Sequence, residues 1–165
     1  MYRVQRSGRF KGSTASNIAL AIEASKLHEV ITGAPLAAWL TVAGSPAGTF
    51  GWTSWVETLD QLATRNDQLI ASAIWGKLED KAANVATEWS VDQIAQVIVV
   101  PGVLGKVAQP GSRVLQSMVR ANQTADPMEM LQWATKMAEV TDRVSGGSAG
   151  LSQCGFGPDW GTYLF

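Results

Sequence analysis

The sequence predicts an α+β fold in which a β-α-β-β unit occurs twice. Short segments that alternate apolar and polar residues, as half-buried strands do, are followed by longer segments with apolar residues at helical spacing. The same order of segments then appears a second time in the 165 residues. A constant offset of 113 positions also superposes three pairs of glycines, at the helix end and at both ends of one turn: Gly33 and Gly146, Gly44 and Gly157, Gly48 and Gly161.

The first unit begins with alternating residues and a capped helix. Tyr2, Val4 and Phe10 share one parity, which predicts a strand over Tyr2–Lys11. "GSTASN" offers N-cap residues for a helix over Ser16–Thr32, which Gly33 would end. The remaining elements of this unit are two strands and the turn between them: Leu36–Ala43, Gly44–Gly48 and Thr49–Val56.

A long helical segment follows the hairpin. Glu57–Val85 has apolar residues at helical spacing and no proline, so we expect one helix with a possible interruption near Gly76. The residues after it, up to Val100, are compatible either with a short helix over Val91–Gln96 or with a strand over Gln96–Val100.

The second unit repeats the order after "PGVLGKVAQPG". Alternation predicts a strand over Arg113–Ala121, and "TADP" supplies an N-cap and an early proline for a helix that ends at Gly146. A strand over Leu151–Phe156 and a turn over Gly157–Gly161 follow. We therefore expect a first module over 1–100, a linker over 101–112 and a second module over 113–165 that lacks its final helix and strand.

Composition and charge exclude several classes of function. Thirteen basic and fourteen acidic residues give a net charge of −1, which argues against nucleic-acid and acidic-membrane partners because both require a basic surface. The single cysteine, Cys154, excludes an intramolecular disulfide and is expected to be a small buried apolar residue. The charged, alternating N-terminus is not that of a signal peptide, so a cytoplasmic location is expected.

The hairpin and the helix start after it resemble the ferredoxin-like module of the dimeric α+β barrel superfamily, which includes antibiotic-biosynthesis-type monooxygenases, EthD-like proteins and NIPSNAP-like proteins. The residues that carry this resemblance are Gly44, Gly48, Thr49, Phe50, Trp52, Trp55, Val56, Thr58, Leu59 and Leu62, with Gly157, Gly161, Thr162 and Tyr163 in the second copy. The resemblance implies two tandem ferredoxin-like modules whose antiparallel sheets pack as a (pseudo)dimeric barrel. Because the second module is incomplete, we also expect an exposed apolar surface and a homo-oligomer.

Motifs for chemistry are absent from the sequence. No metal-binding, phosphate-binding or nucleophile motif occurs, so we expect no cofactor and no metal, and we assign no catalytic residue. His28 is the single histidine and is expected at the edge of the first helix, partly exposed. Superfamily members that degrade haem or oxidise polyketides use Asn, Trp and His within the barrel. This chain lacks a histidine on a strand, which argues against haem degradation.

The seven tryptophans are first of all expected to fill the core and interfaces. Trp52 and Trp55 have opposite parity and should face opposite sides of the sheet. As a ligand site we predict that Trp39 and Trp52 line an apolar pocket, with Arg6 or Gln116 as its polar group. The leading function is a non-catalytic role in binding a small apolar ligand or in assembly.

The alternative function is a cofactor-independent monooxygenase or isomerase that acts on an aromatic or polyketide-like substrate. In that case Trp39 and Trp52 would position the substrate, and Arg6 or Asn17 would stabilise an enolate-like oxygen.

Overall fold

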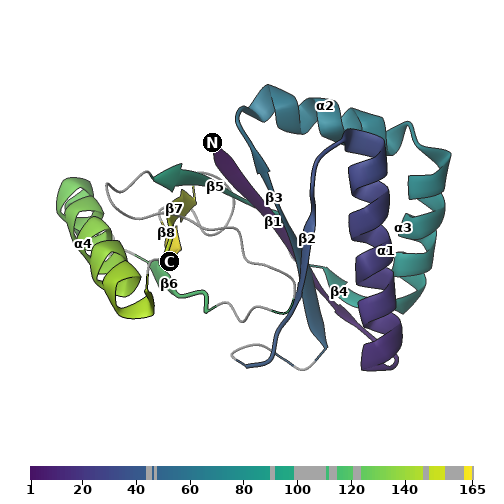
Figure 1. Ribbon diagram of the computed structural model, residues 1–165, viewed down its shortest axis with the longest axis horizontal. Helices are drawn as coiled ribbons and strands as arrows, with labels where there is room; N and C mark the ends of the chain where they lie inside the picture. The colour runs from purple at the N-terminus through teal and green to yellow at the C-terminus, as the bar shows by residue number, and fades with distance from the viewer. Residues whose placement is uncertain are drawn as a thin grey trace. The chain divides into compact units, whose positions relative to one another are not determined.

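The computed structural model has an α+β fold with eight strands, antiparallel in their pairings, and four helices among the residues that it describes (Figure 1). These residues are 1–43, 46, 48–89, 92–98, 111, 115–120, 124–146, 149–154 and 162–164. The chain divides into two compact units, Met1–Gln93 and Ile94–Phe165. The predicted linker 101–112 lies outside the described residues except for Gly111, as does the predicted turn Gly157–Gly161.

Unit 1 contains a four-stranded antiparallel sheet in the order β2-β3-β1-β4. Its strands are β1 (Tyr2–Phe10), β2 (Ala37–Leu40), β3 (Thr49–Val56) and β4 (Ala86–Trp89). β1 and β3 pair over eight residues, from Tyr2 opposite Val56 to Arg9 opposite Thr49. β1 and β3 are thus central, and β2 forms one edge.

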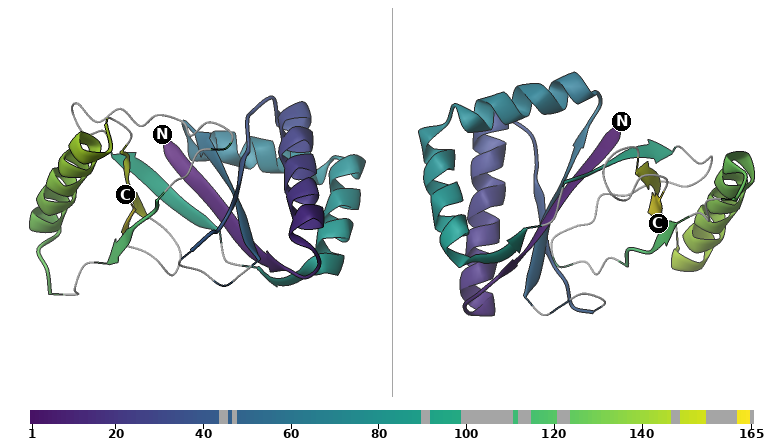
Figure 2. Two further views of the ribbon diagram at one scale, coloured as in Figure 1. Left: turned by 60° about the horizontal axis from the view of Figure 1, so that its bottom comes forward. Right: turned by 180° about the vertical axis from the view of Figure 1, so that it is seen from behind.

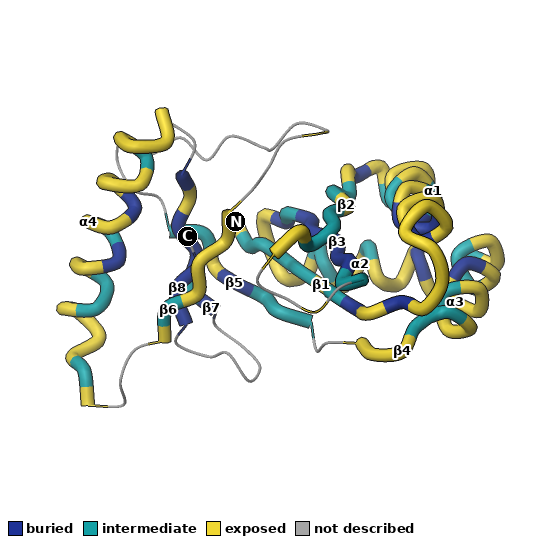
Figure 3. Tube along the Cα trace, turned by 90° about the horizontal axis from the view of Figure 1, so that it is seen from below, coloured by how far each residue is buried: buried dark blue, intermediate teal, exposed yellow. Residues whose placement is uncertain are grey.

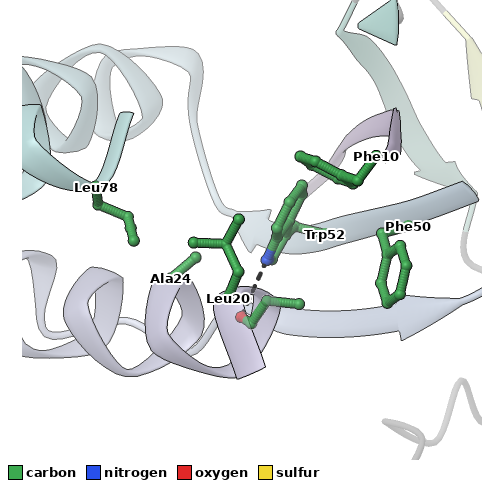
Figure 4. Close-up of a cluster of buried hydrophobic side chains, with 7 residues drawn as sticks. Phe10, Leu20, Ala24, Phe50, Trp52 and Leu78 are labelled. Atoms are coloured by element: carbon green, nitrogen blue, oxygen red, sulfur yellow. Dashed lines mark hydrogen bonds between the residues drawn. The ribbon is translucent and has the colours of Figure 1, made fainter. Parts of the chain in front are cut away.

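Three helices lie on one face of this sheet: α1 (Thr14–Thr32), α2 (Leu59–Ile70) and α3 (Ala73–Val85) (Figure 2). Side chains on alternate positions of β1 and β3 point toward them, and Phe10, Phe50 and Trp52 form the sheet side of the core. Leu20 and Ala24 of α1 and Leu78 of α3 close it from the helix side (Figure 4).

Local signals in the sequence place α1 correctly. Ser13 has extended backbone angles, and its side chain accepts a hydrogen bond from the Ser16 amide at 3.1 Å. Gly33 ends the helix with a φ of 69°, a left-handed conformation that glycine adopts without a steric penalty. The strands predicted before and after this helix are present as β1, β2 and β3.

The predicted interruption of the long helix near Gly76 is wrong in position. The chain breaks at Ala71 and Ser72, and Gly76 lies inside α3. The reason is a second N-cap, because Ser72 is extended and its hydroxyl accepts a hydrogen bond from the Trp75 amide at 3.3 Å. A serine that caps a helix determines the break here, and the glycine does not.

The region after α3 agrees with the strand alternative and not with the helix alternative, and it contains one further strand. It forms β4 directly after the helix and then β5 (Gln93–Ile98), so the short helix over Val91–Gln96 is wrong and the strand begins three residues before Gln96. β4 was not predicted. It follows α3 without a turn residue, and the edge of the sheet at Gly8–Phe10 supplies its pairing partners.

Unit 2 contains one helix among its described residues, α4 (Pro127–Ser145), and strands in the order β5-β7-β8-β6. The strands other than β5 are β6 (Met118–Arg120), β7 (Leu151–Cys154) and β8 (Thr162–Leu164). As predicted, α4 begins at the "TADP" cap and ends at a left-handed Gly146. Cys154 is buried with Ala95 and Leu164, as expected of a small apolar residue.

The two units agree in detail at the offset of 113. Both α1 and α4 have 19 residues, with N-caps at Ser13 and Asp126 and left-handed glycines at their ends. The hairpin registers also agree, because Trp39 opposite Gly51 corresponds to Ser152 opposite Leu164. The first strands differ, since β6 pairs with β8 two residues out of step with the β1–β3 pairing.

Candidate functional site

The alternation along β3 divides unit 1 into two chemically different faces. Trp52 points toward the helices, and the intervening residues Gly51, Thr53 and Trp55 lie on the face that these helices do not cover. The predicted opposition of Trp52 and Trp55 is confirmed. The helix-free face also receives Trp39 from β2, since Trp39 is paired with Gly51.

The Trp39 ring packs directly over Gly51. A Cβ added to Gly51 would lie 2.0 Å from Cζ2 of the Trp39 ring, so only glycine leaves room for this approach. The indole Nε1 donates a hydrogen bond to the Thr53 hydroxyl at 3.1 Å. Packing and this hydrogen bond together fix the ring, while the side chain remains half-buried.

Polar residues of β1 share this face with Trp39. Ser7 is paired with Gly51 and Gln5 with Thr53, and pairing places each on the same face as its partner. Arg3, paired with Trp55, donates a hydrogen bond to the Gln5 side chain. We call the surface formed by Trp39, Gly51, Thr53, Gln5 and Ser7 the Trp39 shelf.

Trp52 belongs to the core on the other face. It is only 9% exposed. Its Nε1 donates a hydrogen bond to the Ala21 carbonyl at 3.3 Å, drawn as the dashed line from Trp52 in Figure 4. Its ring meets Phe10 edge-on at 6.0 Å and stacks on Trp89 at 6.3 Å. Trp39 and Trp52 therefore lie on opposite faces of the sheet and do not line a common pocket, contrary to the geometry that we expected of them.

Arg6 lies on the same face as Trp52 and is held in an ion pair. Its Nε and Nη2 donate to the two carboxylate oxygens of Asp92 at 2.6 and 2.7 Å. The hydrogen bond to Asp92 raises the pKa of Arg6; desolvation opposes this rise, and the charges of Asp92 and Glu79 add to it. The guanidinium is thus engaged by a carboxylate on the face away from the Trp39 shelf.

The other predicted polar residues lie elsewhere. Asn17 is 5% exposed in the first turn of α1. Gln116 is exposed in unit 2, just before β6. Neither residue belongs to the strands whose pairings form the Trp39 shelf.

His28 is buried, with 6% exposure, so the expectation of a partly exposed histidine is wrong. Its Nδ1 lies 2.9 Å from the Ala34 carbonyl oxygen, and its ring meets Trp75 edge-on at 6.3 Å. Burial lowers the pKa of His28, against the opposing effect of the Ala34 carbonyl. The residue is buried because α3 packs beside α1, which a single-helix pattern does not reveal.

Two further features bear on the chemistry of the described residues. Among them, no group of three or more His, Cys, Asp or Glu side chains is arranged to hold a metal ion. A hollow of about 410 Å³ lies on α4, lined by Leu131, Gln132, Thr135, Lys136 and Glu139, and it contains none of the predicted site residues.

No helix in the described part of the chain combines the length and apolarity needed to cross a membrane.

Sequence reasoning missed Gly51, Thr53 and Gln5 as parts of the site. The alternation along β1 and β3 could have indicated this face, because Arg3, Gln5 and Ser7 occupy alternate positions of β1 and therefore lie on the same side of the sheet. The missing information was the register between β2 and β3, which sets Trp39 over a glycine.

No protein-family model matches this chain, and no curated protein matches it. An uncharacterized NIPSNAP-like domain protein from Burkholderia xenovorans is similar in structure, with 18% identity and a TM-score of 0.51, over 67% of this chain and 97% of its own. A NIPSNAP family protein from Agrobacterium tumefaciens has 18% identity and a TM-score of 0.50, over 56% and 82%.

A putative chlorite dismutase is 15% identical with a TM-score of 0.51, and the match covers 99% of this chain and 77% of that protein. At these identities the likeness concerns the fold. The chain thus shares the ferredoxin-like α+β fold of NIPSNAP and chlorite dismutase-like proteins.

Proposed function

We propose that this chain is a non-catalytic, homo-oligomeric cytoplasmic protein that binds a small apolar, planar ligand on the Trp39 shelf. The observation that carries the proposal is the fixed Trp39 ring, which packs on Gly51 and is held by Thr53. An aromatic ring that is already ordered loses little conformational entropy when a ligand stacks on it. The preferred ligand is aromatic, because offset stacking on indole adds to the gain from apolar burial.

The polar residues at the border of the Trp39 shelf favour a ligand that carries some polar groups. Gln5 and Ser7 place an amide and a hydroxyl opposite Thr53 and Gly51 on the face that carries Trp39, and Arg3 donates a hydrogen bond to the Gln5 side chain. A few polar groups at the edge of an apolar surface orient a bound molecule without requiring it to be charged.

We further propose that the chain arose by tandem duplication of one ferredoxin-like module, and that the two sheets pack as a pseudodimeric barrel. The equal lengths, caps and hairpin registers at the offset of 113 support the duplication. The similarity to a putative chlorite dismutase over 99% of this chain fits a fold that includes both units.

The alternative of a cofactor-independent monooxygenase or isomerase gains no support from the described residues. It needs Arg6 or Asn17 beside the substrate to stabilise an enolate-like oxygen. Arg6 binds Asp92 on the opposite face of the sheet from Trp39, and Asn17 is buried at the start of α1.

A titration with 1-anilinonaphthalene-8-sulfonate tests ligand binding, because this probe is planar and apolar and fluoresces when removed from water. We expect saturable binding to the full chain and, in W39L, a dissociation constant raised by about tenfold, since a stacking contact contributes on the order of 1 kcal/mol. W133L is the matched control, because Trp133 is 41% exposed on α4.

The binding measurements distinguish the Trp39 shelf from a binding site at Trp133. Binding lost in W39L and kept in W133L supports the Trp39 shelf. Equal binding to wild type and W39L, or a loss confined to W133L, contradicts it.

A further inference from the structure

Helix α4 carries a stripe of large apolar side chains that are exposed. Trp133, Met137, Val140 and Val144 recur every three or four residues, so they lie on one side of the helix. Their exposed fractions are 41, 39, 43 and 83%. We call these four residues the α4 stripe.

The α4 stripe is distinct from the side of the helix that packs on the sheet. That side presents Ala134 and Ala138, both fully buried against Leu151 of β7 and Tyr163 of β8. Figure 3 shows these buried positions alternating with exposed ones along α4. At 100° per residue the stripe is about one third of a turn away from the alanines, so it faces sideways along the sheet.

The equivalent side of α1 shows what such a face accommodates. At the offset of 113 the α4 stripe corresponds to Leu20, Ala24, Leu27 and Ile31. Leu20 and Ala24 are buried with Leu78 of α3, and Leu27 packs against the same cluster. An ion pair from Lys81 of α3 to Glu23 of α1, at 2.5 Å, lies beside this contact. In unit 1, therefore, α3 and the sheet together cover this side.

We propose that the α4 stripe is an interface between two copies of this chain, in which α4 packs antiparallel on α4 of the partner. This inference rests on the homo-oligomer of the proposed function and identifies its contact surface. Apolar side chains of this size and spacing match the ridges that interlock when two helices pack.

Charges beside the α4 stripe favour an antiparallel arrangement of two identical helices. Glu129, Lys136 and Arg143 are seven residues apart and follow one flank of the stripe. An antiparallel two-fold pairing about Met137 sets each Glu129 near the partner's Arg143. The two Lys136 side chains approach the axis, where their flexible stems allow the ammonium groups to diverge into solvent. A parallel two-fold pairing would instead place this flank of the two copies on opposite sides of the interface, where Glu129 and Arg143 could not form ion pairs across it.

Sedimentation velocity of the full chain over a range of concentrations tests this interface. We expect wild type to self-associate and V144K to raise the dissociation constant by about tenfold or more, because each copy would bury a lysine. V30K is the matched control. Val30 lies near the end of α1 and is 82% exposed, against 83% for Val144.

A charge exchange tests the orientation. E129R should weaken association by about fivefold, because it sets two pairs of like charges together, and E129R combined with R143E should restore it. Wild type that stays monomeric overturns both the homo-oligomer and the interface. An oligomer that V144K leaves intact, or that the exchanged charges fail to restore, overturns the α4 interface and leaves the homo-oligomer standing.

Discussion

Helices α1 and α4 have the same length and the same kinds of caps, but their lateral sides differ in environment. In unit 1, Leu20 and Ala24 are buried in one cluster with Leu78 of α3 and with Phe10, Phe50 and Trp52 of the sheet. In unit 2 the matching positions, Trp133 and Met137, are 41 and 39% exposed. The backbone of the module is thus maintained by caps, turns and the sheet-facing side of the helix. The lateral side is buried within its own unit in one case and partly exposed in the other.

The largest expected difference is between two matching positions of the helices, Leu20 in α1 and Trp133 in α4. Leu20→Ala should lower the free energy of unfolding by about 2–5 kcal/mol, because it leaves a cavity between α1, α3 and the sheet. Trp133→Ala, at the matching position, should cost less than about 1 kcal/mol at protein concentrations too low for association. Chemical denaturation of both variants measures the difference, and equal losses would show that α4 is buried as α1 is.

A second effect concerns two glycines of unit 1. Gly51→Ala should cost about 1–3 kcal/mol, because the added methyl group collides with the Trp39 ring. Gly76→Ala should instead stabilise the protein by about 0.5–1 kcal/mol, since it lies inside α3 with open space around the new Cβ. Thermal or chemical unfolding checks both signs. A stable Gly51→Ala variant that still binds the probe would contradict the packing of the Trp39 shelf.

The smallest effect is a dependence on pH that arises in unit 1. Burial lowers the pKa of His28, so the unfolded chain takes up a proton more readily than the folded one. Stability is therefore full above the ordinary histidine pKa and falls as the pH drops through it toward the folded value. His28→Gln should flatten the change in unfolding free energy between pH 7.5 and pH 5. Arg65 and Glu29 also act on His28, in opposite directions, and both remain in the variant. An unchanged slope would exclude His28 as its origin.

The sequence predicted those parts of the fold that depend on local signals. The N-cap serine before α1, the cap before α4 and the two left-handed glycines set helix ends correctly. β3 has the predicted bounds, because aromatic and β-branched residues run from one turn to the next. The break at Ser72 was missed because a single serine within an apolar-periodic segment gives a weaker signal than glycine.

The site was less predictable because it depends on contacts between strands. The identity of Trp39 as a candidate came from the sequence, but its position over Gly51 depends on the register of β2 against β3. Arg6 and Trp52 were grouped with Trp39 without regard to parity, and the pairing of Arg6 with Trp52 places both on the helix face. The alternation of side chains within one strand can be derived from the sequence. Which residues of different strands share a face depends on the register between the strands, and that register requires the tertiary structure.

Hydroxyl-radical footprinting of the full chain, at several protein concentrations, tests most directly that the lateral side of α4 is an available docking surface while that of α1 is already covered. We predict that oxidation of Trp133 and Met137 is high in dilute protein and falls as concentration rises. Oxidation of Leu20 and Trp52 should stay low throughout, since both are less than 10% exposed. Oxidation of Trp133 and Met137 that does not change with concentration would contradict this account.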